Sequence, residues 1–310
     1  MAEIALVATD LRISASRRRK ESGVRVVFFL AATLSVVITV LIIVSLVGEA
    51  LAFVTSDDFT WGSVTEIGWF PRRGFYDIGT LIVGSLIVTV IAILVAWPLG
   101  VGSAIYLSEY AKPKVRRVLK PILEILAGIP SVVLGFFALT VISPDLVQKI
   151  FTDSPQFNLL AAGLGVGILT IPLVASISED ALRSVPNALR EASEGLGARK
   201  MTTTVQVVVP AAVSGLMAAL IVGVSRAIGE TMVVAIAAGA SGGSLFTTDP
   251  LAPGQTMTAA MASLATGTDQ VRGASGAFQS LFFVGLVLFV ITLLLNILSE
   301  RFVRRVRQRY

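Results

Sequence analysis

The sequence contains no cysteine and no histidine. Without cysteine there is no disulfide bond and no thiol nucleophile, and without histidine the chain lacks the commonest general base and metal ligand. No G-x-x-x-x-G-K-[ST] segment occurs, so the chain has no loop of its own that could cradle the phosphates of ATP. We therefore expect no catalytic residue, no metal site and no cofactor in this chain, although Asp, Glu, Lys, Ser and Tyr could still support catalysis.

Charge is also scarce. Charged residues make up 15% of the 310 residues, hydrophobic residues make up 55%, and the mean hydropathy is +0.84. A soluble domain of this length needs a larger charged surface, whereas lipid solvates apolar side chains directly. Most of six apolar stretches are long enough to cross a hydrocarbon core of about 30 Å, which predicts an all-α membrane protein with six transmembrane helices. The stretches are residues 26–47, 80–104, 122–142, 159–177, 207–238 and 281–298.

The basic residues lie mainly at one end of the predicted spans. Twenty of the 25 lysines and arginines fall in segment 1–25, in the loops after the second and fourth spans, and in the tail 300–310. Only four fall on the opposite side, and Arg226 lies inside a span. The positive-inside rule then predicts a multi-pass protein of the inner or plasma membrane with both termini in the cytoplasm. Because the charges flank apolar segments, the net charge of +5 reflects topology and does not indicate nucleic-acid binding.

The remaining segments are expected to be arms and loops. Residues 1–25 are expected to form a cytoplasmic arm. Residues 26–47 are expected to form an uncleaved anchor helix, because the apolar run is too long for the h-region of a signal peptide. An external loop at 48–78 then precedes a transmembrane domain at 79–299. The outer loop 241–279 is rich in Gly, Ser, Thr and Ala, and its TMTAAMASL segment favours a short helix.

The loop 178–206, between the fourth and fifth spans, carries helix signals that a plain connector would lack. Ser184 can cap a helix, Pro186 sits near its first turn, and residues 188–196 favour helix. Two glycines, the second of them Gly197, then permit a sharp turn. These signals predict two short helices that meet at a glycine and face the cytoplasm.

This loop resembles the EAA loop of ABC importer permeases, whose pattern is Glu-Ala-Ala, three residues, Gly, nine residues, and Ile-x-Leu-Pro. The spacing matches in full at Glu191, Ala192, Ser193, Gly197 and Pro210. The departures are Ser193 in place of alanine, and two valines in place of Ile and Leu before Pro210. The resemblance implies that the helix docks into a groove of a separate ATPase subunit and transmits its motion. A connector helix that lies on the membrane surface is the alternative that the residues alone leave open.

A charged pair lies inside the fifth span. Arg226 and Glu230 are four residues apart, so they share one face of a helix. Either charge alone would be costly in hydrocarbon, so both should face a protein interior or a wet cavity. Guanidinium stays protonated, and its fork of donors matches a tetrahedral oxyanion. The pair could therefore serve anion passage, and a structural ion pair that fixes helix packing is the alternative.

The segment RAIGETM, which contains this pair, is similar to the R-A-[IL]-G-E-T segment of the phosphate-specific permeases PstC and PstA. Its final methionine favours the PstC type, and AGIPSVV in the third span and QTMTA in the outer loop resemble the same group. The resemblance implies roles in phosphate translocation for Arg226 and Glu230. Ser131 and Thr231 are added because hydroxyls near a pathway can bond phosphate oxygens, with helix packing as the alternative. Glu124 is expected to reach water or to pair with a basic neighbour.

This resemblance covers nearly the whole chain and implies a type I ABC importer permease that carries phosphate. The implied partners are a PstA-like second permease, two copies of a PstB-like ATPase that bind ATP and Mg²⁺, a PstS-like external phosphate-binding protein, phosphate and membrane lipid. Nucleic acid is not expected. Three alternatives stay open: a permease for another oxyanion such as molybdate or sulfate, an ion-coupled secondary phosphate carrier, and a receptor that senses phosphate without moving it. A secondary carrier would also use an Arg–Glu pair inside the membrane, but it would not need a cytoplasmic docking helix.

Overall fold

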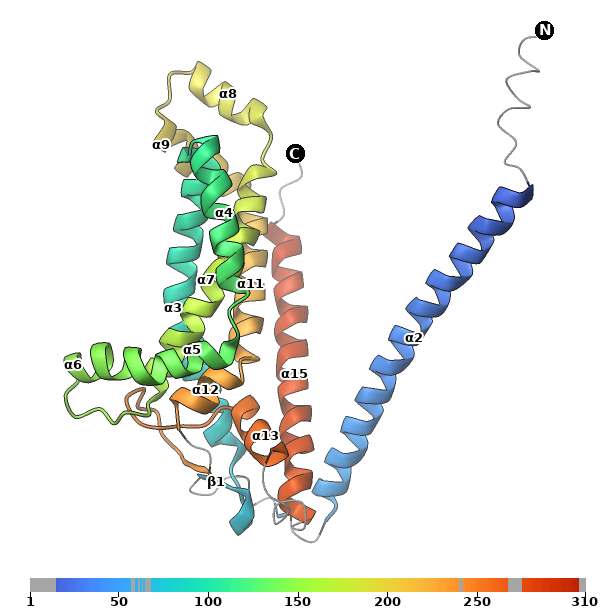
Figure 1. Ribbon diagram of the computed structural model, residues 1–310, viewed down its shortest axis with the longest axis vertical. Coiled ribbons are helices and arrows are strands. Elements are labelled where there is room, and N and C mark those ends of the chain that lie inside the picture. The colour runs from blue at the N-terminus through green and yellow to red at the C-terminus, as the bar shows by residue number, and fades with distance from the viewer. Residues whose placement is uncertain are drawn as a thin grey trace. The chain divides into compact units, whose positions relative to one another are not determined.

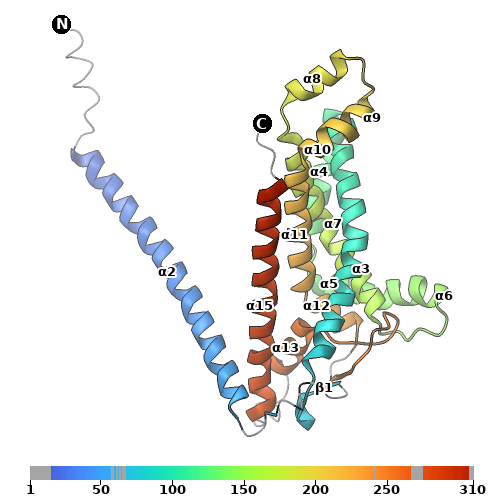
Figure 2. The same cartoon turned by 180° about the vertical axis from the view of Figure 1, so that it is seen from behind.

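The computed structural model describes residues 15–56, 59–60, 62, 64, 68–239, 242–266 and 275–306, with the backbone alone described at 15–20, 22, 275 and 302–306. The chain divides into two compact units, residues 1–49 and 50–310. Helices make up most of the described residues, as Figures 1 and 2 show, so the predicted all-α class is confirmed.

The first unit consists mainly of one long helix, α2 (Ala15–Val54), whose last residues, 50–54, belong to the second unit. It contains a segment, Gly23–Val54, that is long and apolar enough to cross a membrane. The helix begins at Ala15 and continues to Val54, so it extends beyond both ends of the predicted anchor at 26–47. The Arg- and Lys-rich run before the apolar stretch consists of good helix formers, which extend the helix past the lipid-facing residues. Residues 1–14 of the expected arm lie outside the described residues.

The second unit is built on the parallel pair α3 (Ile78–Ile105) and α7 (Leu159–Arg183), which both run from the end that holds strand β1 (Gly68–Phe70) towards the end that holds helix α8 (Asn187–Gly195), as Figure 1 shows. Each of the two helices begins at a residue whose side chain caps it. Asp77 accepts hydrogen bonds from the Gly79 amide (2.9 Å) and the Thr80 hydroxyl (2.6 Å), and Asn158 accepts one from the Ala161 amide (2.7 Å). The π-helical turn η3 (Tyr106–Tyr110) extends α3. Helix α11 (Val213–Ile228) packs against both members of the pair, and α15 (Ser275–Val306) packs against α11.

Small residues bring α3 and α7 close together. A Cβ placed on Gly100 would lie 2.8 Å from Val174 Cγ1, and a Cβ on Gly163 would lie 2.7 Å from Ile91 Cβ. Two helices in lipid gain little from hiding apolar surface, so they associate through close packing, which small residues permit. The pair is therefore a tightly fitted interface on which the other helices rest.

The third apolar stretch is not one continuous span, as 122–142 had been expected to be. Helix α4 (Pro113–Ala127) ends at Gly128, and α5 (Ser131–Phe137) begins after Pro130. Proline has no amide hydrogen and forces the residue before it out of helical geometry, which explains the break. The chain then continues through the π-helical segment η4 (Ala138–Val147) into α6 (Gln148–Ile150), and Figures 1 and 2 show α5 and α6 running across the direction of α4.

The fifth stretch, expected at 207–238, is broken twice. Helix α9 (Lys200–Thr203), the π-helical η5 (Thr204–Val208) and α10 (Val209–Ala211) lead to a bend of 69° before α11, beside Pro210. A second break at residues 229–231 separates α11 from α12 (Met232–Ala237). The sequence did not reveal the second break, because residues 229–231 contain no proline.

A small three-stranded sheet closes one end of the second unit. Strands β1 (Gly68–Phe70), β2 (Phe75–Tyr76) and β3 (Ser244–Leu245) form an antiparallel sheet in the order β2-β1-β3, with the 3-10 turn η2 (Pro71–Arg73) between the first two. Trp69 and Tyr76 are buried against Phe53, which joins them to a core that also includes helix α13 (Met257–Ala265). The short helix expected in the outer loop is confirmed by α13, and part of that loop lies outside the described residues.

Five helices in the described part of the chain are long and apolar enough to span a membrane, and a sixth is present if the bent pair counts as one. This agrees with the predicted six spans, although the third runs over Ser131–Ile150. Helix α15 continues to Val306, so the expected tail at 300–310 is helical up to that residue. Within the second unit, α8 (Asn187–Gly195) and the sheet lie at opposite ends, which we call the α8 end and the sheet end (Figures 1 and 2).

The tight α3–α7 interface generates a stability prediction. Gly100→Val should lower the thermal unfolding midpoint in detergent, because forcing atoms into a packed interface costs about 1–3 kcal/mol. Gly102→Val is the matched control, since a Cβ at that position meets nothing within 4 Å. The two variants should be compared by circular dichroism during heating, and equal midpoints would rule out the proposed close packing.

Candidate functional site

The predicted Arg226–Glu230 pair lies at the break between α11 and α12. The Glu230 side chain is 7% exposed and the Arg226 side chain is 50% exposed, with Nη2 4.0 Å from Oε2. The Glu230 backbone is held from α13, because the Thr258 hydroxyl donates a 2.8 Å hydrogen bond to its carbonyl oxygen. The carboxylate Oε1 also lies 3.5 Å from the amide of Val233, at the start of α12. The backbone of Glu230 is thus held in place and its side chain is buried, while the Arg226 guanidinium is loosely paired and accessible.

Ser131 and Thr231 lie at the two breaks themselves. Thr231 precedes α12 and donates a long 3.3 Å hydrogen bond to the Gly229 carbonyl, and Ser131 is the first residue of α5. Both side chains are half-buried. Helix α12 packs on α5, where a Cβ on Gly135 would lie 3.1 Å from the Met232 carbonyl oxygen. The structure therefore brings the two breaks into one region, but among the described residues no hydrogen bond joins Ser131 to the charged pair.

The predicted docking helix is present as α8, over Asn187–Gly195, close to the expected 188–196. Gly197 follows with φ of +80°, in the left-handed region that favours glycine, so the expected turn is confirmed. Pro210 lies in α10 after the second short helix. The prediction for Ser184 was wrong: its hydroxyl donates to the Ala181 carbonyl (2.7 Å) at the end of α7, and Pro186 occupies the N-cap position of α8.

The three residues that align with Glu-Ala-Ala differ in their surroundings. Glu191 and Ala192 are exposed, whereas Ser193 is half-buried. The Ser193 hydroxyl lies 2.9 Å from the Thr203 hydroxyl, at the end of α9. This hydrogen bond closes the hairpin formed by α8, Gly197 and α9. The departure from alanine at Ser193 therefore has a structural role in this chain.

Sequence reasoning missed Arg190, which fastens α8 to the rest of the second unit. Its Nη2 and Nε donate to the two carboxylate oxygens of Glu109 in η3, at 2.9 and 3.3 Å. Its Nη1 and Nη2 also donate to the carbonyls of Val185 (2.7 Å) and Leu182 (2.9 Å) at the end of α7. The Arg190 and Glu109 side chains are only 17% and 7% exposed. A guanidinium that binds both oxygens of one carboxylate forms two charge-assisted hydrogen bonds, which are stronger than neutral ones and fix the relative orientation of the two groups.

This anchor generates a prediction about local stability. Glu109→Gln should accelerate amide hydrogen exchange in α8 about tenfold or more, because losing charge-assisted hydrogen bonds costs about 1.5–3 kcal/mol. Exchange is read by mass spectrometry of peptides that cover Asn187–Gly195. Glu194→Gln is the control, since it removes an exposed carboxylate from α8 that forms no ion pair within the described residues. Unchanged exchange in Glu109→Gln would mean that α8 is held by other contacts.

Comparison with known proteins gives the chain a family. Residues 96–308 match the family described as "Binding-protein-dependent transport system inner membrane component". The PstC phosphate transport system permease protein of Mesorhizobium japonicum is 32% identical over 295 residues, which cover 87% of this chain and 88% of that one. The probable ABC transporter permease YqgH of Bacillus subtilis is 40% identical over 178 residues, 57% of each chain.

A solved structure is similar to the whole fold. It is a bacterial ABC transporter involved in the import of the acidic polysaccharide alginate, with a TM-score of 0.64 at 14% identity, covering 94% of this chain and all of that one. At this identity the likeness concerns the fold alone, and the predicted type I importer permease fold is confirmed. Because the family pattern covers most of its length and a full-length relative shares almost a third of its residues, the chain belongs to the binding-protein-dependent transport system inner membrane components.

Proposed function

We propose that this chain is the transmembrane permease subunit of an ABC importer that carries inorganic phosphate into the cell. The observation that carries the proposal is the half-exposed Arg226 guanidinium beside the buried Glu230 carboxylate, at a break in a membrane helix. The similarity to PstC, named as a phosphate transport permease, supports phosphate as the cargo. Molybdate or sulfate is the outcome to consider if phosphate uptake does not depend on this chain.

The geometry of the pair suits an anion that must be held and then released. Arg226 offers up to five donors that no pH change removes, and at 4.0 Å its contact with Glu230 is too long for a strong hydrogen bond. A phosphate oxygen can therefore replace the carboxylate as its partner. Glu230 stays nearby and repels the bound anion, which limits the affinity. Ser131 and Thr231 are proposed to supply hydroxyl donors at the same pair of breaks.

We propose that α8 is the element that receives motion from the ATPase. Glu191 and Ala192 lie exposed on it and would enter a groove of the ATPase subunit, and Gly197 and Pro210 shape the turn and the path back to α11. Arg190 ties α8 to η3 and to the end of α7, so a displacement of α8 would act on the α3–α7 pair. ATP and Mg²⁺ would be bound by the partner ATPase, and this chain would catalyse no reaction itself.

The proposed assembly contains further subunits, because this chain would form only part of the pathway and would not hydrolyse ATP. A PstA-like permease would complete the pathway, two PstB-like subunits would supply ATP hydrolysis, and a PstS-like protein would deliver phosphate at the sheet end. The α8 end would face the cytoplasm, together with both termini. The excess of basic residues near the α8 end supports this orientation.

Phosphate uptake tests the cargo and the role of Arg226 together. In phosphate-starved cells that lack the gene, the intact gene should restore ATP-dependent uptake of radiolabelled phosphate. Arg226→Gln should restore less than about a tenth of it, since a charge-assisted contact to phosphate contributes about 1.5–3 kcal/mol. Arg301→Gln, which removes an exposed arginine from α15, is the control at matched membrane abundance. Full rescue by Arg226→Gln would reduce the pair to a packing role, and uptake that survives deletion without a second system would exclude phosphate.

Substituting two glycines of the hairpin tests whether the left-handed backbone at Gly197 is needed for transport. Gly197→Ala should lower phosphate uptake, because alanine at φ of +80° costs roughly 1–2 kcal/mol and distorts the turn. Gly195→Ala should leave uptake unchanged, since that glycine ends α8 without a positive φ and a Cβ there meets nothing within 4 Å. Uptake and binding-protein-stimulated ATPase activity would be measured in proteoliposomes. Equal effects of the two substitutions would count against a coupling role for this turn.

A further inference from the structure

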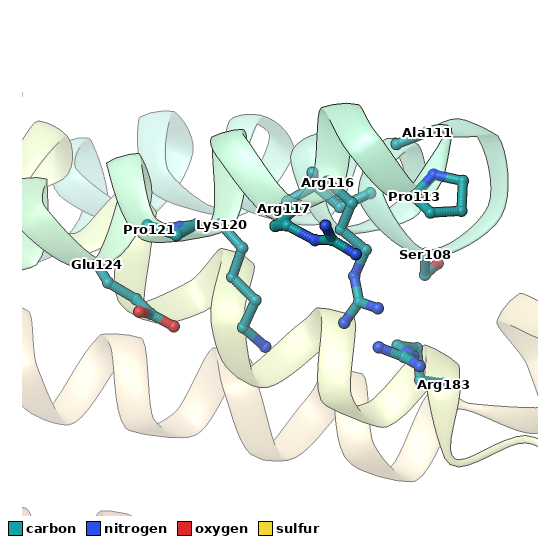
Figure 3. Close-up of a pocket in the computed structure, with 10 residues that line it drawn as sticks. Ser108, Ala111, Pro113, Arg116, Arg117, Lys120, Pro121, Glu124 and Arg183 are labelled. Carbon is teal, nitrogen blue, oxygen red and sulfur yellow. The ribbon is translucent and has the colours of Figure 1, made fainter.

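A pocket of about 590 Å³ opens near the α8 end, between η3, α4 and the end of α7. Four of its lining residues are cationic: Arg116, Arg117, Lys120 and Arg183. Figure 3 shows Arg116 and Lys120 extending from α4 towards α7, and Arg183 extending from α7 towards Arg116. Its volume lies in the roughly 300–1,000 Å³ range of small-molecule sites. The proposed transport function leaves this pocket without a role, since it shares no lining residue with the Arg226 region.

One buried carboxylate, Glu179, lies beside three of these four cations. Glu179 is 1% exposed and accepts a 2.7 Å hydrogen bond from Arg116 Nε, while Lys120 Nζ lies 3.0 Å from its other oxygen. Arg183 Nη1 lies farther away, at 3.9 Å. The hydrogen bond to Glu179 and the Glu179 charge raise the pKa of Lys120, with smaller contributions from Asp180, so the ammonium stays protonated at neutral pH. Arg116 and Lys120 are thus held at the pocket by a carboxylate that is almost fully buried.

The positive charge at the pocket is only partly neutralised. Arg117 forms no ion pair within the described residues, and Lys120 has Asp180 as a second partner at 3.3 Å, but that carboxylate is 69% exposed. The four cations outnumber Glu124, Glu179 and Asp180, the carboxylates that line the pocket or pair with its cations. Several cations that converge on one cavity repel each other, and an anion bound between them removes that repulsion.

Membrane topology alone does not account for this arrangement. Cations that only set orientation need to lie on the correct side of the membrane and can point anywhere into water. Here Arg116, Arg117, Lys120 and Glu124 recur at helical spacing along one face of α4, and all of them line the same pocket. Lys112 and Lys114, at the start of the same helix, do not. The sequence therefore concentrates charge on one face of α4.

We propose that this pocket is a second anion site, which binds the phosphate group of either free inorganic phosphate or a phospholipid headgroup. Arg117 and Arg183 would donate to its oxygens in the two-pronged manner of guanidinium, and Lys120 would add a point charge. Glu179 is a positioning residue, because it acts through Arg116 and Lys120. The inference goes beyond the proposed transport function and can be tested without any transport.

The test measures how phosphate protects Lys120 from an amine-acylating reagent. The purified full chain is kept in phosphate-free maltoside detergent, and modification of each lysine is followed by peptide mass spectrometry. Inorganic phosphate should slow modification of Lys120 about threefold or more once its concentration exceeds about twice Kd, because protection grows as 1 + [L]/Kd. The exposed Lys200 should be unaffected, and chloride at the same ionic strength should give no protection. Short-chain phosphatidic acid in place of phosphate tests the lipid source.

Substitutions then decide whether the pocket itself is responsible. Arg117→Gln should raise the phosphate concentration for half-protection about tenfold, while Lys114→Gln, an equal loss of charge on α4 outside the pocket, should not. Arg117 has no ion pair to lose among the described residues, so the fold is expected to survive the substitution, and the elution volume in size-exclusion chromatography checks this. Protection at lower concentration by phosphate identifies a soluble ligand, and by phosphatidic acid a lipid headgroup. The proposal is overturned if neither protects, if chloride protects equally, or if Arg117→Gln behaves as the unaltered chain.

Discussion

The arrangement of this protein depends on one constraint: a backbone amide or carbonyl inside a membrane must find its partner within the protein. A helix may break at that depth only where other parts of the chain cover and bond the exposed groups. The break between α11 and α12 meets this condition, because the Thr258 hydroxyl bonds the Glu230 carbonyl and α13 covers the site. The break between α4 and α5 lies against the same region through the contact of α5 with α12. The candidate site is thus located where the chain can tolerate irregular backbone.

The second requirement is a rigid body that can connect this site to the α8 end. The α3–α7 pair supplies it, because glycines such as Gly100 and Gly163 let the two helices approach closely. Arg190 joins α8 to this pair through Glu109 and two carbonyls of the α7 terminus. Dense packing transmits displacement, since a close-packed interface cannot yield gradually. Under the proposed function, a displacement of α8 would therefore act on the helices that support the Arg226 region.

Much of this structure could be predicted from the sequence. Hydrophobic length predicted the spans, and the glycine at 197 predicted the turn, because each depends on local chemistry. The break at Pro130 was missed although proline was visible, since the apolar run continues through it. Contacts between residues far apart in the sequence could not be predicted. Arg190 and Glu109 are 81 residues apart, and no local sequence pattern links them. The basic residues of α4 were interpreted as topology signals, because only the fold shows that they share a cavity with Arg183.

The three-stranded sheet has a consequence for the amplitude of motion. Its central strand β1 precedes α3, and its partner β3 follows α12, with Trp69 opposite Ser244 and Gly68 opposite Leu245. This pairing is a short tether between the rigid helix pair and the segment beyond the second break. A strand of two residues offers few hydrogen bonds, so the tether permits small rotations of α12 and resists larger ones until those bonds open. The sheet would therefore limit how far α12 can turn about the break at residues 229–231.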